Sequence, residues 1–337
     1  MTDNAENTVA DNTPTPGVST KAQRPSSRGR WLLLGAVIAV AGGGTYLAWG
    51  GGDAVETTNN EIRFETSPTS NTLKPIVKGG ITDLLNDHPI AAAENPLDPL
   101  LLVAEAGLER LRQDLKDYTA TIERQERVDG KLMPTETIAL KIRQAQHNEE
   151  GETTVSRAIY TRHMAPKSMA GQEAIWEQGE NDGNLVAHIP PGFLNVKRFY
   201  LPPTGFLAMR GSRYPITEAG FEVLIERMLE RGRRDREYEG EPCHVSIDRE
   251  AVINGRSCTM FEIVHDKEEG PFDFHIARIA IDDELNLPIH YEALIWPEEE
   301  GGEPQLLERY TYTDIVINPG LDPEAFNPSN PDYKYPK

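Results

Sequence analysis

The chain has 337 residues, of which 38% are hydrophobic, so it contains enough apolar side chains for at least one folded domain. Its formal net charge is −20; residues 1–30 carry +1, so the rest carries −21. Phosphate backbones repel a domain this acidic, and we therefore expect no nucleic-acid partner.

Near the N-terminus, residues 31–50 read WLLLGAVIAVAGGGTYLAWG and contain no charged side chain. About twenty such residues are needed to cross the hydrocarbon core of a bilayer. Because three arginines precede the stretch, the positive-inside rule places the N-terminus in the cytoplasm. We therefore predict a single-pass anchor in the cell inner membrane, with the C-terminal domain in the periplasm. Ala48 and Gly50 leave a cleaved signal peptide as the less favoured alternative.

Two polar segments flank the predicted transmembrane helix. Residues 1–30 predict a disordered cytoplasmic tail, and residues 51–95, rich in Thr, Asn, Ser and Pro, predict a flexible tether. Within the tether, ITDLLNDHPI at 81–90 is compatible with a helical turn or a docking peptide. The extracytoplasmic domain is then expected to cover residues 96–337.

The domain is expected to begin with a helix, for which Asp98 is the candidate N-cap and Pro99 the first residue. Apolar residues between 101 and 115 recur at helical spacing. From residue 118 onward they alternate instead, and DG at 129–130 and NDG at 181–183 are turn signals. This pattern predicts about five antiparallel strands in a meander.

A second helix is predicted within ITEAGFEVLIERMLERGRRD, with Thr217 as its candidate N-cap, and about five further strands follow it. The sum is an α+β fold. We expect a large curved antiparallel sheet with the two main helices packed against its concave face. A helix lying in a curved sheet leaves an apolar trough, which suits apolar ligands.

The stretch IDDELNLPIHYEA, residues 281–293, places three consecutive acids ahead of His290. The acids lie between two alternating runs, so we interpret them as the solvated turn of a hairpin. A register that pairs His275 with Leu294 and His290 with Ile279 keeps the two histidines apart. Since no motif for a nucleophile, a zinc site or a phosphate loop occurs either, we predict no metal, no cofactor and no catalytic residue.

The loop PTGFLAMRGSRYPIT, residues 203–217, mixes apolar side chains with arginines between two regular regions. It is interpreted as either a plug over the trough or a ligand contact. Arg210 and Arg213 are candidates for meeting a ligand head group. The candidate apolar lining of the trough is Trp176, Phe206, Leu207, Met209, Phe221, Leu224 and Met228.

Only two cysteines occur, Cys243 and Cys258, too few for a four-ligand zinc site without histidines. An oxidising compartment would allow them to form a disulfide. A hairpin that turns at Asn254-Gly255, however, places Ala251 opposite Cys258 and residue 266 opposite Cys243. The pairing of the two cysteines therefore stays open.

Two segments near the C-terminus, ARIAIDDELNLPIHYEALIW and LERYTYTDIVINPGLDPEAFNPSNPDY, resemble the closing part of the LolA/LolB-like lipoprotein-carrier superfamily. The matching residues are Asp282, Leu287, Pro288, Tyr310, Tyr312, Asn318, Leu321 and Phe326. Together with PTGFLAMRGSRYPIT, they make residues 95–335 similar to the family of the domain of unknown function 1571. The resemblance implies a half-open antiparallel barrel in which helices cover an apolar cavity, and it implies no catalytic residues.

We therefore predict a membrane-anchored extracytoplasmic protein that binds an apolar ligand, a lipid or an acyl chain, and that is not an enzyme. The superfamily's soluble carriers shuttle through the periplasm, whereas a chain tethered by residues 31–50 reaches only as far as its linker. The alternative is a regulatory or scaffold module of the envelope that binds a protein partner.

Overall fold

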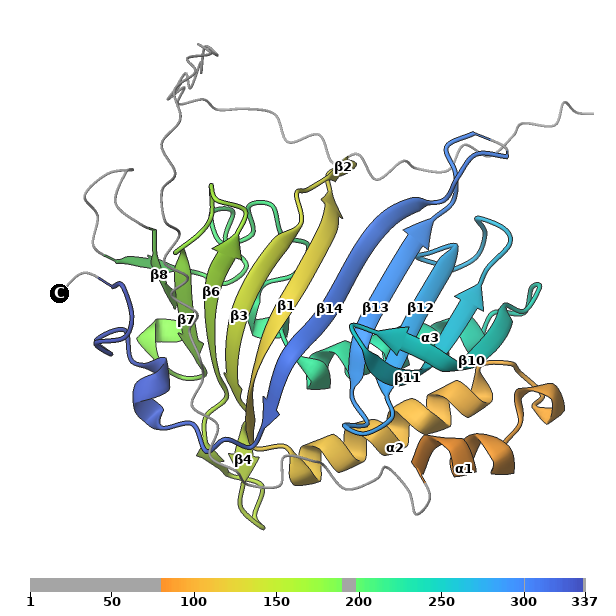
Figure 1. The fold of residues 1–337 in the computed structure, drawn as a ribbon, viewed down its shortest axis with the longest axis horizontal. Coiled ribbons are helices and arrows are strands. Elements are labelled where there is room, and N and C mark those ends of the chain that lie inside the picture. The colour runs from red at the N-terminus through yellow and green to blue at the C-terminus, as the bar shows by residue number, and fades with distance from the viewer. Residues whose placement is uncertain (1–79, 190–197, 300, 336–337) are drawn as a thin grey trace, which may run out of the picture. The chain divides into compact units, whose positions relative to one another are not determined.

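A large antiparallel sheet forms the body of the protein. The computed structural model describes residues 80–189, 198–299 and 301–335. Across these residues the twelve-stranded sheet has the order β10-β11-β12-β13-β14-β1-β3-β6-β7-β8-β9, and β2 pairs with β1 (Figure 1). The first strands are β1 (Asp117–Val128), β2 (Lys131–Leu132), β3 (Glu136–Arg143), β6 (Ala158–Ala165), β7 (Glu173–Glu177), β8 (Leu185–His188) and β9 (Phe199–Leu201). The later strands are β10 (His244–Ile253), β11 (Arg256–Val264), β12 (Ile276–Asp282), β13 (Pro288–Ile295) and β14 (Gln305–Ile317), while β4 (Gln146–His147) and β5 (Thr153–Val155) form a separate pair.

The pairing of β1 with β14 joins the two halves of the sheet. Each half is a run of antiparallel neighbours, as expected from the alternating pattern, and the first and last long strands of the chain meet along their length. The register pairs Ile122 with Tyr312 and Glu126 with Glu308. Because side chains of paired residues point to the same face, this register decides which residues share the interior.

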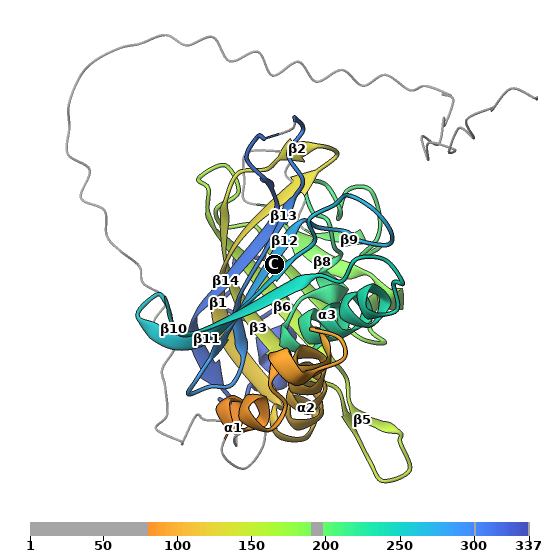
Figure 2. The same ribbon diagram turned by 90° about the vertical axis from the view of Figure 1, so that its right-hand side faces the viewer.

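The long helices α2 (Asp98–Asp114) and α3 (Phe221–Arg236) lie on the same side of the sheet, as Figure 2 shows. Leu111 of α2 and Phe221 of α3 are fully buried, in one cluster with sheet residues such as Tyr118 and Ile142. The prediction of a large antiparallel sheet with few helices is therefore confirmed.

Both long helices begin at positions other than those predicted. The N-cap of α2 is Leu97, and Asp98 is the first helical residue. The second helix begins at Phe221 instead of next to Thr217, which lies in a short 3-10 turn. The reason is Gly220: its φ is 112°, and a Cβ there would lie 2.6 Å from the hydroxyl oxygen of Tyr118. A residue in this conformation cannot continue a helix.

Part of the segment expected as a tether is folded. Helix α1 spans Gly80–Asp87, and its Ile81 and Leu85 are buried against Val103 of α2 and Phe261 of β11. The two apolar residues are four positions apart and so lie on one face of a helix, which gives this short segment something to bury.

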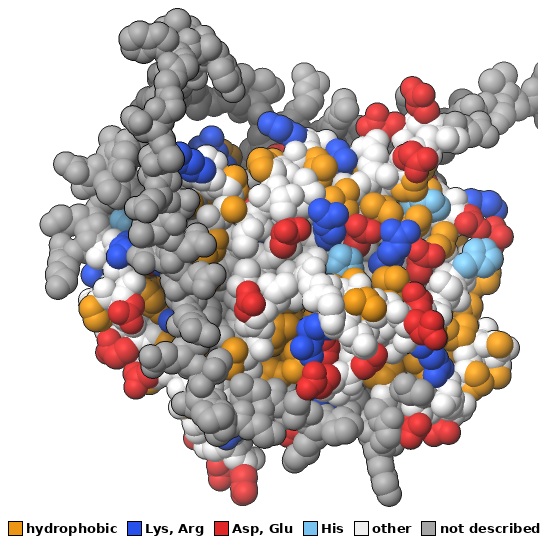
Figure 3. All heavy atoms as spheres, in the orientation of Figure 1, with side chains coloured by type: hydrophobic (Ala, Val, Ile, Leu, Met, Phe, Trp, Pro, Cys, Tyr) orange, Lys and Arg blue, Asp and Glu red, His pale blue; other side chains and the backbone are white. Residues whose placement is uncertain are grey.

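The C-terminal segment covers the opposite face of the sheet over β6, β7 and β8. Phe326 and Tyr333 lie in a buried cluster with Tyr160 and Ile175, and the ring of Tyr333 stacks on that of Tyr160 at 4.2 Å. Farther along the same face, charged side chains of both signs lie side by side (Figure 3). They include a cross-strand ladder of ion pairs formed by Glu262, Arg278, Glu292 and Arg309.

The predicted turns at 129–130, 181–183 and 254–255 are confirmed, since left-handed residues occur at each of them. Two predicted registers are wrong by one residue over part of their length. His290 faces Ala280 instead of Ile279, and His244 faces Val264, because each hairpin contains a bulge that the alternating pattern does not reveal.

The turn at 282–287 is present, but its first acid is not solvated. Asp282 is fully buried, and its Oδ1 accepts hydrogen bonds from the backbone N–H groups of Glu284 and Leu285 at 3.0 and 2.7 Å. The guanidinium of Arg256 also pairs with this carboxylate. Asp282 therefore organises the turn from inside the protein instead of facing water.

Among the helices of the described residues, none is long and apolar enough to cross a bilayer. The predicted transmembrane stretch, residues 31–50, lies outside the described residues, as do the predicted cytoplasmic tail and most of the predicted tether.

Replacing Asp282 with Ala is expected to reduce the free energy of unfolding by about 1–3 kcal/mol, because two turn amides lose their buried acceptor and Arg256 loses one of its two carboxylate partners. Urea denaturation followed by circular dichroism measures the loss. Glu284→Ala in the same turn is the matched control, because this side chain is 71% exposed; its loss should stay below about 1 kcal/mol. Equal losses for the two variants would contradict the role assigned to Asp282.

Candidate ligand-binding cavity

A cavity of about 290 Å³ lies between the sheet, the first half of α3 and the loop of residues 202–220. Strands β1, β3, β6, β7, β8, β9, β13 and β14 contribute to its floor, and the loop and α3 form its roof. This volume is close to the lower end of the range for small-molecule sites, roughly 300–1,000 Å³. Its apolar wall includes Ile122, Ile138, Leu140, Leu185, Ala187, Leu201, Leu207, Ile216 and Leu224.

The alternation of the strands explains why the floor is apolar in the middle of the sheet. Ile138 and Leu140 on β3 point to the helix side, and Lys141 between Leu140 and Ile142 contacts Tyr333 on the opposite side. The same period-two rule places Ile122 of β1 in the cavity wall.

A polar shelf, defined as Arg124, Glu126, Arg213, Tyr214, Arg231, Tyr291, Glu308 and Tyr310, borders the apolar part of the cavity. Its centre is unusual, because Glu126 and Glu308 are direct partners in the β1–β14 register and are only 3% and 1% exposed. Two buried carboxylates placed side by side need compensating donors. Arg213 supplies two of them: its backbone N–H donates to Glu126 at 2.9 Å, and its Nε donates to Glu308 at 3.0 Å.

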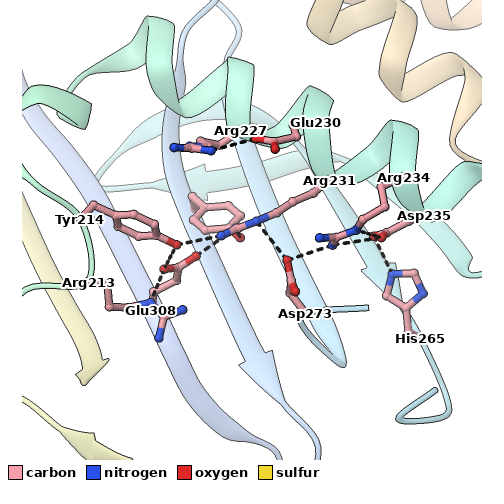
Figure 4. A network of polar contacts seen from close by, with 11 residues as sticks. Arg213, Tyr214, Arg227, Glu230, Arg231, Arg234, Asp235, His265, Asp273 and Glu308 are labelled. Carbon is pink, nitrogen blue, oxygen red and sulfur yellow. Dashed lines mark hydrogen bonds and ion pairs between the residues drawn. The ribbon is translucent and has the colours of Figure 1, made fainter. Parts of the chain in front are cut away.

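Arg231 approaches Glu308 from α3, as Figure 4 shows. Its Nη1 donates to Glu308 at 3.1 Å and to the hydroxyl of Tyr291 at 2.8 Å, and its Nη2 donates to the hydroxyl of Tyr214 at 2.7 Å. Burial alone would lower the pKa of Arg231, but Tyr291 and Glu308 outweigh it and raise the pKa above its ordinary value. Arg231 therefore remains a cation and holds α3 against the shelf.

The tyrosines of the shelf stay protonated. Burial and the neighbouring Glu308 carboxylate raise the pKa of Tyr214 and of Tyr310 above the ordinary tyrosine value. The hydroxyl of Tyr310 donates to Glu126 at 2.6 Å, and that of Tyr214 donates to Glu308 at 2.9 Å. Each buried carboxylate is thus solvated by protein groups instead of by water.

At the other end of the shelf, Arg124 forms an ion pair with Glu136 at 2.8 Å and donates to the hydroxyl of Ser212 at 3.0 Å. Burial would raise the pKa of Glu136, yet hydrogen bonding to His163 and the charge of Arg124 hold it below its usual range. Every guanidinium of the shelf therefore faces at least one carboxylate.

The loop of residues 202–220 is held at two places. Arg213 attaches its middle to the shelf, and the Arg157 guanidinium donates to the carbonyls of Thr217 and Ala219 near its end. Between these contacts and β9, Leu207 lines the cavity although it is 63% exposed. The loop covers the cavity, and its residues Leu207 and Ser212 also line it.

The structure brings only some of the predicted site residues together. Leu207 and Leu224 line the cavity, whereas Phe206 is 84% exposed and points away from it. Arg210 is exposed on the same loop. Met209 is half-buried outside the cavity wall, and the guanidinium of Arg213 is engaged with the shelf.

Three further candidates pack elsewhere. Phe221 is fully buried between Tyr118 and Tyr312, and Trp176 packs on the main core while its indole N–H donates to the carbonyl of Gly183. Met228 lines a separate apolar cavity of about 90 Å³ on the other flank of α3. A one-dimensional hydrophobic pattern identifies inward-facing residues but does not separate filled core from open space.

The predicted site does not include the shelf residues Glu126, Arg231, Tyr291, Glu308 and Tyr310. One signal was available, because Glu126 and Glu308 occupy inward positions of alternating strands, where a carboxylate is out of place. Their direct pairing depends on the β1–β14 contact and has no local signature.

The two cysteines are both free and both buried. They lie in different hydrophobic clusters, Cys258 in the main core and Cys243 beside Phe274 and Tyr291. Burial, together with a nearby Asp in each case, raises the pKa of either thiol to about 11. Within the described part of the chain no group of three or more His, Cys, Asp or Glu side chains is arranged to hold a metal ion.

The fold and the cavity define an α+β protein in which a curved antiparallel sheet and a covering helix enclose a mostly apolar space with one polar, ion-paired border. The chain belongs to the DUF1571 family of proteins of unknown function, whose model matches residues 115–335. This confirms the family indicated by the sequence motifs. No curated protein matches the chain.

Among solved structures, the chain shows distant similarity to several bacterial proteins. A lipoprotein-sorting protein domain, described as putative and outer-membrane, from Vibrio parahaemolyticus is 14% identical, with 66% of this chain and 97% of that chain covered and a TM-score of 0.30. The lipoprotein LppX of Mycobacterium tuberculosis is 13% identical, with 65% and 96% covered and a TM-score of 0.33. A LolA superfamily protein of Nitrosomonas europaea is 12% identical, with 66% and 96% covered and a TM-score of 0.24.

The role of Arg213 in holding the loop can be tested with two neighbouring arginines. Arg213→Met is expected to reduce the free energy of unfolding by about 3–5 kcal/mol, because Glu308 loses a buried charge partner. Limited proteolysis should then cut the loop of residues 202–220 faster. Arg210→Met should change stability by less than about 0.5 kcal/mol, since its side chain is exposed. Similar effects of both substitutions would contradict the proposed attachment.

The state of the cysteines can be read by thiol titration. With a pKa of about 11, each thiol is only about 0.1% ionised at pH 8, so the folded protein should react slowly with a thiol reagent. After denaturation without reductant, both cysteines should react, and Cys243→Ser should remove half of the signal. No reaction before reduction and full reaction after it would show that the two residues form a disulfide.

Proposed function

We propose that this protein is a membrane-anchored extracytoplasmic binding protein that holds an apolar ligand, a lipid or an acyl chain, without catalysing a reaction. The observation that carries the proposal is the cavity of about 290 Å³ under α3 and the loop of residues 202–220, with its mostly apolar wall. An apolar space of this size beneath an anchored cover suits storage or handover of a water-insoluble molecule.

The size of the cavity limits the ligand. One water molecule occupies about 30 Å³ in the liquid, and a methylene group is of similar size. The cavity therefore has room for roughly ten methylene groups. Burial of each methylene contributes about 0.8 kcal/mol, and the cost of ordering the chain offsets part of the sum. One acyl chain of intermediate length therefore fits better than a lipid with several long chains.

The arrangement of the titratable groups supports a binding role over catalysis. Glu126 and Glu308 each accept hydrogen bonds from arginine and tyrosine, so neither carboxylate is left free to act as a general base. The membrane anchor in this proposal rests on the predicted span 31–50. We favour an apolar ligand over a protein partner because the loop of residues 202–220 covers the cavity.

The test fills the cavity without disturbing the core. Ala187 lies in the cavity wall and is half-buried, so Ala187→Phe should place a ring in the space that a ligand needs. The uncharged fluorophore N-phenyl-1-naphthylamine should bind the wild-type domain with enhanced emission. Its affinity should fall at least about tenfold in the variant, corresponding to about 1.4 kcal/mol.

Ala170→Phe is the matched control, because Ala170 is exposed and does not line the cavity. This variant should bind the fluorophore like the wild type. If the wild-type domain binds no fluorophore and carries no lipid when purified, the ligand-binding proposal is wrong. A stoichiometric protein partner that crosslinks equally to wild type and Ala187→Phe would then favour the envelope scaffold instead.

A further inference from the structure

The polar shelf limits what the cavity accepts, because its charges already compensate one another. Three carboxylates, Glu126, Glu136 and Glu308, face the three guanidiniums of Arg124, Arg213 and Arg231. The shelf and its buried partner Glu136 are therefore formally neutral when these groups are ionised. Asp273, whose carboxylate lies 3.6 Å from Nε of Arg231, is 45% exposed and has its own counter-charge in Arg234 at 2.9 Å. All three carboxylates are at least nine-tenths buried, so water contributes little to their solvation.

The contacts within the shelf are direct. Glu308 forms ion pairs with Arg213 at 3.0 Å and with Arg231 at 3.1 Å. Glu136 forms an ion pair with Arg124 at 2.8 Å. The second carboxylate of the central pair, Glu126, accepts one hydrogen bond from the Arg213 backbone and another from the Tyr310 hydroxyl. A ligand carboxylate or phosphate would have to take an arginine away from a buried glutamate, and a ligand amine would have to take a glutamate away from an arginine.

Two uncharged hydroxyl groups can still form hydrogen bonds with a ligand, that of Ser212 beside the shelf and that of Tyr310 within it. The Ser212 hydroxyl oxygen accepts from Arg124 at 3.0 Å, so its own proton can be donated to a ligand. The Tyr310 hydroxyl donates to Glu126, so its oxygen can accept a hydrogen bond. Both residues line the cavity. One donor and one acceptor without a net charge match a hydroxyl group, which is itself both donor and acceptor.

We infer that the cavity selects single-chain amphiphiles whose polar end is an uncharged hydroxyl, and discriminates against carboxylates, phosphates and amines of the same chain length. The inference rests on the proposed function and specifies its ligand class. In this arrangement the chain lies along Ile122, Leu140 and Leu224, and the hydroxyl lies against the shelf. A charged end would be desolvated beside a neutral shelf that offers no unpaired counter-charge, which is unfavourable.

The experiment measures displacement of N-phenyl-1-naphthylamine from the purified domain by three ten-carbon compounds at pH 8: 1-decanol, decanoate and decylammonium. At this pH decanoate is ionised, decylamine is protonated, and a histidine of ordinary pKa is neutral. We expect decanol to bind at least about tenfold more tightly than either ion. Decanoate or decylammonium binding as tightly as decanol would overturn the inference.

Because decanol is also the most hydrophobic of the three compounds, charge variants provide the decisive comparison. Glu308→Gln gives the shelf a net positive charge, and the affinity ratio of decanoate to decanol should rise by roughly tenfold. Arg231→Met gives it a net negative charge, and the ratio of decylammonium to decanol should rise instead. If a ligand's polar end lies in water outside the cavity, neither ratio changes, and the inference is wrong.

Controls and a stable variant complete the design. Arg233→Met on α3 removes a positive charge, and Glu262→Gln on the opposite face of the sheet removes a negative charge. Neither residue lines the cavity, so both affinity ratios should stay at the wild-type values. If the single variants unfold, Arg231→Met combined with Glu308→Gln restores neutrality and should keep the preference for decanol. A domain that binds neither the fluorophore nor any of the three compounds refutes the proposed function itself, whereas binding with unchanged ratios refutes only the hydroxyl selectivity.

Discussion

The structure depends on the pairing of β1 with β14, which places Glu126 beside Glu308 in the interior. Two adjacent buried carboxylates are unfavourable unless donors surround them, and the chain provides these from two separate elements. Arg213 comes from the loop of residues 202–220 and Arg231 from α3. The buried carboxylates of the sheet thus hold the loop and α3 over the cavity through these two arginines, and the sheet, the loop and the helix are linked into one unit.

This arrangement divides the space under α3 into two regions of different chemistry. Toward the middle of β1 and β3 the wall is made of aliphatic side chains, whereas toward β14 it consists of tyrosine hydroxyls and ion pairs. α3 serves both regions, since Leu224 lines the apolar part and Arg231 reaches the polar shelf two turns later. A molecule with one apolar chain and one polar end is complementary to such a space.

Turns and periodicity made much of the fold predictable, and local interactions explain why. Asn254-Gly255 and Asp129-Gly130 adopt left-handed conformations that few other residues tolerate, so their hairpins follow from the sequence. The bulges near Asp248 and Ala280 shift two registers by one residue, and no turn signal or motif in the sequence marks where the extra residue is inserted. The burial of Asp282 escaped prediction because its partner Arg256 lies in another strand.

By itself the sequence determined the α+β class, the alternation of inward and outward residues, most turns and the family, since these depend on contacts a few residues apart or on motifs read along the chain. Only the tertiary structure decided where space is left between the helix and the sheet. Phe221 and Leu224 have the same helical period, yet one is packed between two tyrosines and the other faces the cavity. Whether space is left at a position depends on all the side chains that surround it. The neutral shelf exists only because β1 and β14, about two hundred positions apart in the chain, are neighbours in the sheet.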